Sequence, residues 1–429
     1  MAVATERHRA SLRRWVAGTR PALLRETSFR RYWGAQTISM FGDQISSVAM
    51  PLTAVLVLNA GAAQMGYLTA LLWLPSLLFG VHAGAWVDRR GRRRETMLVA
   101  DLARFALLAS VPVAYAIGIL TLTQLCAVAF AVGLFSVLFN VSDSALFVAL
   151  VRSDEYVEAN SLIHASRALS FVGGPSLGGV LVQLLTAPFA IAADALSFLG
   201  SAALLRRTAA VEPPPAEGED VGLTAGAQFI ARSAIVRAGL CAAATVNFFT
   251  FAFFALFMLY AVHTLHVQPG VLGVVLGAGA VGGGLGAAAT RRLSDAIGVG
   301  RTCVLGCIAF PAPLLLVPLA GGARPLVLAT LFGAEFASGV GVVILDISIS
   351  SILAAVIPNA LRARVTGAFQ AINYGTRPAG ALTAGTLGTL IGLRATLWIA
   401  AAGATLSFLW LLPSPVPQFR MGEKQNPRL

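Results

Sequence analysis

The sequence predicts an all-α integral membrane protein, with twelve transmembrane helices arranged as two pseudo-symmetric bundles of six. Three observations lead to this fold class: the composition, the length of the apolar runs and the placement of the basic residues. The chain of 429 residues is 57% hydrophobic, its mean hydropathy is +0.78, and only 12% of its residues are charged. Soluble proteins carry about 25% charged residues. This chain therefore has too little polar surface for a water-soluble fold.

The apolar runs are long enough to cross a bilayer as helices. A membrane-spanning helix needs about 20 mostly apolar residues, whereas the strands of a membrane barrel alternate over about 10 residues. A helix also satisfies its own backbone hydrogen bonds inside lipid. We expect spans at 34–58, 66–87, 97–117, 122–150, 160–184, 188–205, 238–262, 270–290, 302–320, 326–356, 365–390 and 395–412.

Basic residues gather on one side of the predicted membrane. With the loops assigned alternately to two sides, the side that holds both chain ends carries 26 Lys and Arg residues and the other side two. Cytoplasmic loops are enriched in Lys and Arg, so we expect both termini in the cytoplasm and no cleavable signal peptide. The near-absence of lysine beside abundant Ala and Arg suggests a GC-rich bacterium, and we therefore expect the chain in a bacterial plasma membrane. The net charge of +12 then reflects topology and anionic lipid, not nucleic acid.

A polar segment divides the chain near its centre. Residues 206–237 contain the proline-rich stretch VEPPPAEGED and then AQFIARSAIVR, whose apolar residues recur at helical spacing beside two arginines. Such a helix suits the membrane surface. The domains that we expect are a basic cytoplasmic arm at 1–33, a first bundle at 34–205, this linker at 206–237, a second bundle at 238–412 and a cytoplasmic tail at 413–429.

The two halves repeat each other weakly at an offset of about 203 residues. The matching positions are Asp143 with Asp346, Pro175 with Pro378, and, near that offset, Asp43 with Asn247. Parallel repeats about an axis along the membrane normal are a known plan for transporters, with the substrate site at the midplane between the halves. The repeat therefore favours a transporter.

A dense cluster of charge, GAWVDRRGRRRE at 84–95, follows the second predicted span. Its pattern resembles the loop motif of the major facilitator superfamily between the second and third spans. The matching residues are Gly84, Asp88, Arg89, Gly91, Arg92 and Arg93. By this resemblance, Asp88 and Arg92 help to close the cytoplasmic side against the span 365–390, whose helix dipole favours an anion at its N-terminus. The alternative is that the arginines of this loop only fix topology.

A second motif lies in the predicted span 160–184. The pattern Gly-Pro-x-x-Gly-Gly marks exporters in the same superfamily, and it is matched by Gly174, Pro175, Gly178 and Gly179. The proline frees a backbone carbonyl and kinks the helix, and the glycines give a neighbouring helix a flat face. Generic helix packing is the alternative. Over nearly its whole length the chain resembles the subgroup of enterobactin and macrolide exporters.

Ionisable side chains inside the spans are the candidate functional residues, because buried charge in a membrane is costly. They are Asp43, Asp143, Asp194, Glu335, Asp346, Arg167 and Arg377. Desolvation favours the neutral form of a carboxyl group, which lets the group bind and release protons. We predict Asp43 as the leading proton-coupling residue, on its depth and its lack of a sequence-local partner, with Glu335 second. A structural hydrogen bond is the alternative role for Asp43.

The remaining intramembrane charges have a pairing alternative. Asp143 and Asp346 are further coupling candidates, but each could instead pair with an arginine, Arg167 or Arg377. Asp101 and Arg104 lie three residues apart, at the spacing of a structural ion pair on a helix. The drug/proton antiporters of the superfamily carry an arginine within the fourth span, whereas 122–150 has none. Arg104 or Arg167 would have to take its place.

Enzymatic motifs in the chain occur in the wrong context. GPSLG at 174–178 matches a nucleophile elbow and GAGAVG at 277–282 a dinucleotide fingerprint, but both lie inside apolar spans without the required strand. The single lysine, Lys424, follows no phosphate-binding glycine loop, so the chain is not an ATPase. Cys303 and Cys307 are expected to pack in an apolar helix, and we expect neither a metal nor a cofactor.

The sequence thus predicts a secondary active transporter and not an enzyme. We expect a monomer that exports a small amphipathic molecule (a drug, a natural product or a siderophore) by alternating access, in exchange for protons. Its other partner is membrane lipid. Two alternatives stay open: an importer of a small organic solute, and a membrane scaffold or sensor that transports nothing.

Overall fold

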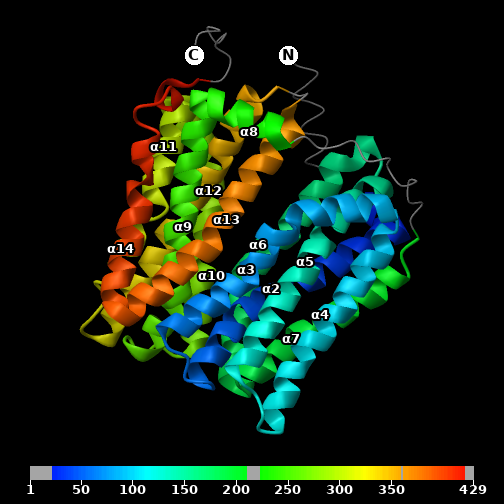
Figure 1. The fold of residues 1–429 in the computed structure, drawn as a ribbon, viewed down its shortest axis with the longest axis vertical. Coiled ribbons are helices and arrows are strands. Elements are labelled where there is room, and N and C mark those ends of the chain that lie inside the picture. The colour runs from blue at the N-terminus through cyan, green and yellow to red at the C-terminus, as the bar shows by residue number, and fades with distance from the viewer. Residues whose placement is uncertain (1–21, 210–222, 359–360, 421–429) are drawn as a thin grey trace.

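The computed structural model describes residues 22–209, 223–358 and 361–420, and these ranges are almost entirely helical (Figure 1). The long α-helices are α2 Thr27–Leu56, α3 Ala62–Arg90, α4 Arg93–Ala116, α5 Leu122–Leu150, α6 Tyr156–Leu185, α7 Ala187–Arg206, α9 Ala234–His263, α10 Pro269–Ile297, α11 Val299–Ala309, α12 Arg324–Val356, α13 Arg362–Leu390 and α14 Leu393–Thr405. The shorter helices are η1 Ala22–Arg25, η2 Ser153–Glu155, α8 Leu223–Arg232, η3 Ala312–Leu316, η5 Leu406–Trp410 and η6 Val416–Gln418.

The twelve long helices correspond in order to the twelve predicted spans, which confirms the predicted fold class. In the described ranges, ten helical segments are long and apolar enough to cross a membrane by length and composition alone. The two that fall short are α2 and α13. Both carry polar residues at mid-length, such as Asp43 and Gln44 in α2 and Arg377 in α13. The surface exposes large apolar side chains such as Leu184 and Leu390, which are 75% and 78% exposed.

Two spans are not continuous α-helices. The predicted span 302–320 begins in α11, which ends at Ala309, and then continues as the 3-10 helix η3. Pro311 and Pro313 lack the backbone N–H that an α-helix needs at this point, which explains the break. The last predicted span also changes from α14 to the 3-10 helix η5 at Leu406.

The helices form two bundles, α2–α7 and α9–α14, that share a core at only one end. We call the end at which α3 meets α4 and α12 meets α13 the basic end, and the end at which α2 meets α3 the far end. At the far end, one apolar cluster includes residues of both bundles, such as Val48 and Met65 of the first and Phe257 and Leu331 of the second. Toward the basic end the first bundle has a separate cluster around Tyr32 and the second has its own.

Glycine pairs let the bundles touch at the far end. A methyl group added at Gly66 of α3 would lie 2.8 Å from Cα of Gly385 in α13, and one added at Gly179 of α6 would lie 2.9 Å from Cα of Gly273 in α10. These two contacts, α3 with α13 and α6 with α10, are related by the pseudo-symmetry of the halves. The bundles therefore interlock at the far end through bare backbone.

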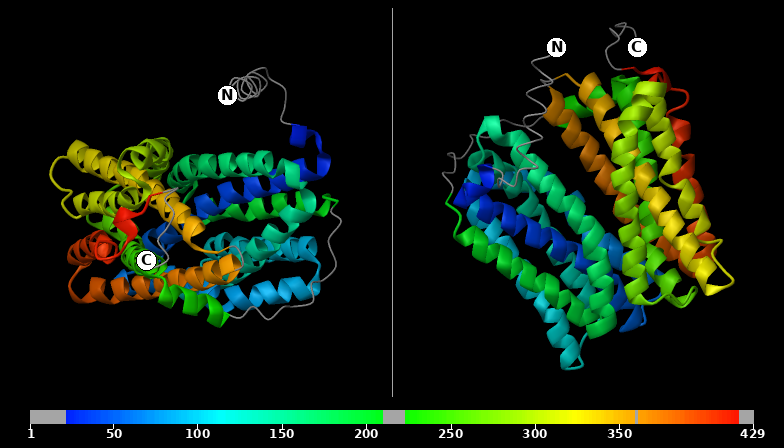
Figure 2. Two further views of the ribbon diagram at one scale, coloured as in Figure 1. Left: turned by 90° about the horizontal axis from the view of Figure 1, so that it is seen from above. Right: turned by 180° about the vertical axis from the view of Figure 1, so that it is seen from behind.

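The same helices separate toward the basic end. No described atom lies within 4 Å of the position where a side chain would begin at Gly80 and Gly84 of α3, Gly284 of α10 or Gly367 of α13. The right-hand view of Figure 2 shows the bundles converging at the far end and diverging toward the basic end. The structure is thus a conformation that is closed at the far end and open at the basic end.

The helix α8 belongs to the expected linker, of which residues 210–222 lie outside the described part of the chain. The segment 227–237 was expected to form one amphipathic helix, but Ser233 interrupts it by capping α9, accepting a hydrogen bond from the Val236 N–H at 3.4 Å. Phe229 and Ile230 of α8 pack against Val236 of α9 and Val365 of α13. The apolar face of α8 therefore covers the second bundle.

Candidate functional site

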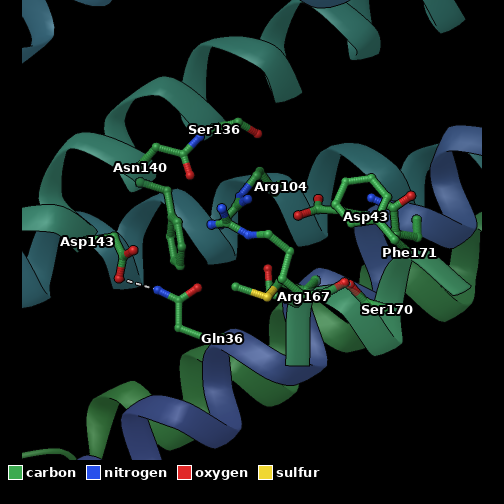
Figure 3. Close-up of a pocket in the computed structure, with 13 residues that line it drawn as sticks. Gln36, Asp43, Arg104, Ser136, Asn140, Asp143, Arg167, Ser170 and Phe171 are labelled. Atoms are coloured by element: carbon green, nitrogen blue, oxygen red, sulfur yellow. Dashed lines mark hydrogen bonds between the residues drawn. The ribbon is translucent and has the colours of Figure 1, made fainter. Parts of the chain in front are cut away.

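A polar cavity of about 210 Å³ lies within the first bundle. Its lining comes from four helices, α2, α4, α5 and α6, and consists of Gln36, Ser39, Met40, Asp43, Gln44, Arg104, Ser136, Phe139, Asn140, Asp143, Arg167, Ser170 and Phe171. Figure 3 shows these side chains converging on the cavity. Three of the predicted intramembrane charges therefore meet in one place.

One face of α2 supplies much of this lining. Tyr32, Gln36, Ser39 and Asp43 recur at intervals of four, three and four residues, which places them along a single stripe of the helix. The Tyr32 hydroxyl donates a hydrogen bond to Asp143 Oδ1 at 2.6 Å. The Gln36 amide donates to the same oxygen, as Figure 3 shows. Asp143 is thereby held in place by two neutral donors from α2.

Arg167 does not form the ion pair that was considered for Asp143. Its side chain is exposed and lines the same cavity, but within the described residues its guanidinium group makes no hydrogen bond or ion pair. Arg167 and Asp143 therefore share the cavity as separate charges in this conformation.

Arg104 and Asp101 form the ion pair expected from their spacing. Both are buried, with side chains 2% and 0% exposed, and the guanidinium group donates to Asp101 Oδ1. The same guanidinium group lies 4.3 Å from the ring centre of Phe139 and 4.0 Å from that of Phe198. Two aromatic faces and one carboxylate thus hold a cation beside the cavity.

Asp43 faces the cavity and is exposed to it. No hydrogen bond of its side chain is found among the described residues, so the alternative of a structural hydrogen bond is not supported in this conformation. Asp194 of α7 lies behind it and is only 1% exposed; its Oδ1 accepts a hydrogen bond from the Ser197 hydroxyl at 3.0 Å. A side chain at Gly42 would collide with Asp194 and Ser197. The glycine therefore lets this buried carboxyl group reach the backbone of α2.

The charges of the second bundle are more dispersed. Glu335 of α12 is 5% exposed, and its Oε1 has no hydrogen-bond partner among the described residues. It packs against α10 at Gly279, where an added methyl group would lie 3.6 Å from Oε2. Asp346 is exposed. The described part of the chain contains no ion pair between Asp346 and Arg377.

Arg377 of α13 instead lies in an aromatic cage that bridges the bundles. Its guanidinium carbon is 4.4 Å from the ring centre of Trp73 in α3, 4.8 Å from that of Phe251 and 4.3 Å from that of Tyr374. Its Nε donates to Asn247 Oδ1 at 3.1 Å. The residue that aligns with Asp43 in the repeat, Asn247, thus serves as a neutral acceptor for this arginine.

The charged loop lies at the basic end, where α3 gives way to α4. Gly91 ends α3 with φ of 65°, a left-handed conformation that glycine adopts without strain. Arg89 is exposed, and Arg92 is exposed in an ion pair with Glu95 at 3.3 Å. Asp88 lies in the last turn of α3, but its side chain is outside the described part of the structure.

The Gly-Pro-x-x-Gly-Gly motif contacts two helices. On one side of α6, Gly174 faces Gln44 of α2, and a methyl group at Gly178 would lie 3.1 Å from Ile45 Cα. On the other side, Gly179 and the carbonyl group of Pro175 meet Gly273 of α10. The motif therefore serves packing inside the first bundle and the far-end contact with the second bundle.

Sequence reasoning missed several residues that shape these sites. The ring of Phe198, the donors Tyr32 and Gln36 and the cage residue Trp73 were not among the candidates. The helical spacing of Tyr32, Gln36, Ser39 and Asp43 is a signal that could have revealed the polar stripe of α2. Trp73 had no such signal, because it reaches Arg377 from a different bundle.

The comparisons with known proteins agree with this architecture. Residues 19–428 match the family described as transmembrane secretion effectors, MFS_3. The chain belongs to this family of the major facilitator superfamily. It is also 30% identical over 386 residues to the multidrug efflux pump Tap of Mycobacterium tuberculosis (strain ATCC 25618 / H37Rv). This match covers 84% of this chain and 87% of Tap. The same identity and coverage hold for Tap of Mycobacterium bovis. The family and these relatives are transporters and not enzymes.

Solved structures share the fold of this transporter at low identity. A variant of the nucleoside transporter NupG superposes with a TM-score of 0.74 at 10% identity, covering 90% of this chain and 99% of NupG. A bacterial homologue of the iron transporter ferroportin in an inward-facing state gives 0.71 at 17%, covering 92% and 99%. A bacterial homologue of the lysosomal transporter Spinster gives 0.70 at 13%, covering 96% and 100%. These likenesses establish the twelve-helix fold of a multi-pass membrane protein.

Proposed function

We propose that this transporter exports a small amphipathic molecule across a bacterial plasma membrane and exchanges it for protons by alternating access. The observation that carries the proposal is the charged cavity of the first bundle, in which Asp43 is an exposed carboxyl group at mid-depth of a membrane-spanning helix. A charge in this position is costly, and such residues mark substrate and proton pathways.

Export is favoured over import by two observations. The relative Tap is called a multidrug efflux pump and is 30% identical over most of both chains. The glycine-proline motif that marks exporters is present in α6 and takes part in the contact between the bundles. A drug, a natural product or a siderophore is the class of cargo that we propose.

The basic end is proposed to face the cytoplasm, because Arg and Lys are enriched in cytoplasmic loops. The present conformation is then open to the cytoplasm, where a cargo molecule would enter. Closure of the basic end would bring Asp88 and Arg92 of the charged loop toward α13, and the glycine pairs of the far end would separate. We propose that a monomer carries out this cycle, surrounded by lipid and without a cofactor.

Protons are proposed as the coupling ions, and Asp43 as the group that meets them in the cavity. Glu335, Asp143 and Asp346 stay secondary candidates. Asp143 already accepts two hydrogen bonds from α2, which hold its side chain in place, whereas among the described residues Asp43 has no such donors. Among the described residues the Oε1 atom of Glu335 has no hydrogen-bond partner, but Glu335 faces α10 from α12 and does not line the cavity of the first bundle.

The test compares the wild type with Asp43→Asn in an efflux-deficient bacterium, over a panel of dyes, antibiotics and siderophores, with and without a proton uncoupler. Asp154→Asn serves as the matched control, because Asp154 is 68% exposed in a loop ion pair outside the spans. We expect the wild type and Asp154→Asn to confer resistance to at least one compound, and both the uncoupler and Asp43→Asn to remove it.

Three other outcomes would change the proposal. Resistance that survives Asp43→Asn but not the uncoupler would keep proton-driven export and move the coupling site to Glu335. Accumulation of a panel compound, instead of resistance, would identify an importer. A third outcome is that the wild type changes the cellular level of none of the compounds, and that neutralising Asp43 or Glu335 has no phenotype. The alternative of a membrane scaffold or sensor would then be favoured.

A further inference from the structure

The first bundle holds more carboxyl groups than its arginines can balance. Four aspartates and two arginines lie inside its spans: Asp43, Asp101, Asp143, Asp194, Arg104 and Arg167. Arg104 is committed to Asp101 by a buried ion pair. Asp143 is held by two neutral donors and shares the cavity with Arg167. Among the described residues, neither Asp43 nor Asp194 forms an ion pair, and Arg104, the cation near Asp43, is already bonded to Asp101.

These two carboxyl groups differ sharply in their access to water. Asp43 opens into the cavity, whereas Asp194 is 1% exposed and lies against the α2 backbone at Gly42, next to Asp43 in the chain. The Ser197 hydroxyl donates to Asp194 Oδ1 at 3.0 Å. One carboxyl group thus meets the water of the cavity, and the other lies in the dry interface of α2 and α7.

The charged groups around Asp194 come from three helices. Asp43 on α2 and Arg104 on α4 are close enough to interact electrostatically with it, and Asp101 on α4 interacts in the same way with Asp43. On α6, Arg167 lines the cavity on which Asp43 opens. Two neighbouring carboxyl groups in a dry site repel each other when both are ionised, and an unpaired buried charge is strongly unfavourable. A single proton on the pair would relieve both costs.

We propose that Asp194 stores the coupling proton and that Asp43 passes it between Asp194 and the water of the cavity. This inference rests on the proposed proton-driven export and names the residue at which the proton waits. When the proton moves from Asp43 to the buried carboxyl group, an O–H bond breaks on Asp43 and another forms on Asp194. The negative charge then lies on Asp43, where Arg104 is the nearby cation. The reverse step returns the proton to the cavity, so that no oxidant or reductant is involved.

The test is an infrared titration of the purified full-length protein in lipid vesicles. Protonated carboxyl groups have a carbonyl-stretching band that ionised groups lack. At neutral pH, we expect the wild type and the surface control Asp154→Asn to show this band, and we expect Asp194→Asn to lose the intensity of one carboxyl group. An unchanged band in Asp194→Asn would overturn the proposal. The proposal would also be overturned if Asp43→Asn lost this intensity and Asp194→Asn did not, because the protonated group of the wild type would then be Asp43.

A second variant guards against misfolding of Asp194→Asn. Ser197→Ala removes the hydrogen bond to Asp194 Oδ1. The carbonyl-stretching band of Asp194 should therefore move to higher wavenumber, while Asp194 stays protonated. A band that does not move would contradict the assignment to Asp194. The outcome is independent of cargo: if cells show no export while the titration behaves as expected, the proposed function fails but the proton site stands.

Discussion

At the scale of single residues, Arg104 is the charged side chain that the fold constrains most. It lies between the rings of Phe139 and Phe198 and is paired with Asp101, and both charged groups are almost fully buried. A buried ion pair adds little to stability relative to an apolar pair, but removal of one partner leaves an uncompensated charge. Arg104 also lines the cavity, so its position sets the electrostatic environment of Asp43.

The first prediction concerns this ion pair. Arg104→Met leaves Asp101 buried without its cation and should lower the free energy of unfolding by about 3–5 kcal/mol, the range for a broken buried pair. The double variant Asp101→Asn/Arg104→Met should recover part of this loss, because no charge is left unpaired. Arg152→Gln, in the exposed pair with Asp154, is the control and should change stability by about 0–1 kcal/mol. Thermal denaturation in detergent measures all three, and equal losses in the single and double variants would contradict the argument.

The candidate residues could be predicted from the sequence only as far as their depth in a span. Asp43 and Glu335 stand out because each is a carboxyl group within a long apolar run. The sequence carries no comparable signal for the difference between them, since the exposure of Asp43 depends on how α2, α4, α5 and α6 pack. Pairing of Asp346 with an arginine was one alternative, but Arg377 packs against Trp73 of the other bundle. Contacts between distant helices have no local pattern from which they could be read.

At the scale of elements, helix order was predictable and helix contacts were not. Apolar runs and charged loops locate the spans, because lipid imposes a minimum length and an apolar surface on each helix. The prolines 311 and 313 could have indicated the break in the span 302–320. The use of the glycine motif was harder to foresee. Two glycines of the motif contact α2 of the same bundle and the third contacts α10 of the other. Only the packed structure shows which helix each glycine contacts.

The second prediction follows from this division. Gly179→Ala places a methyl group 2.9 Å from Cα of Gly273, and overpacking of this kind typically costs about 1–3 kcal/mol. Because the contact exists where the far end is closed, the variant should disfavour the present conformation and reduce export. Gly333→Ala in α12, which has no described atom within 4 Å of the added methyl group, should export normally. Export by both variants, at matched protein levels, checks the prediction, and normal export by Gly179→Ala would count against a gating role for the glycine pair.

At the scale of the whole molecule, the pseudo-symmetry of the two halves explains why one end can close while the other opens. The far-end contacts are two crossings, α3 with α13 and α6 with α10, each formed by helices at equivalent places in the halves. The apolar core is continuous across the bundles only at that end. Rotation of one bundle against the other about the middle of these crossings would open the far end and close the basic end, while the cavity inside the first bundle moves as a unit.

The last prediction tests this rotation by distances between spin labels, in a variant whose four cysteines are replaced. Ser161→Cys in α6 with Ala288→Cys in α10 reports the basic end, and Leu184→Cys in α6 with Gln268→Cys beside α10 reports the far end; all four positions are exposed. In the resting protein, the basic-end pair should be far apart and the far-end pair close. Addition of a cargo identified in the export panel, or a change of pH, should shift populations in opposite directions at the two ends, because the bundles move as rigid bodies.

A control pair within one bundle, Ser161→Cys with Arg207→Cys, should not change. Distances that change at one end alone would contradict the rotation of whole bundles and would indicate local bending of α6 or α10.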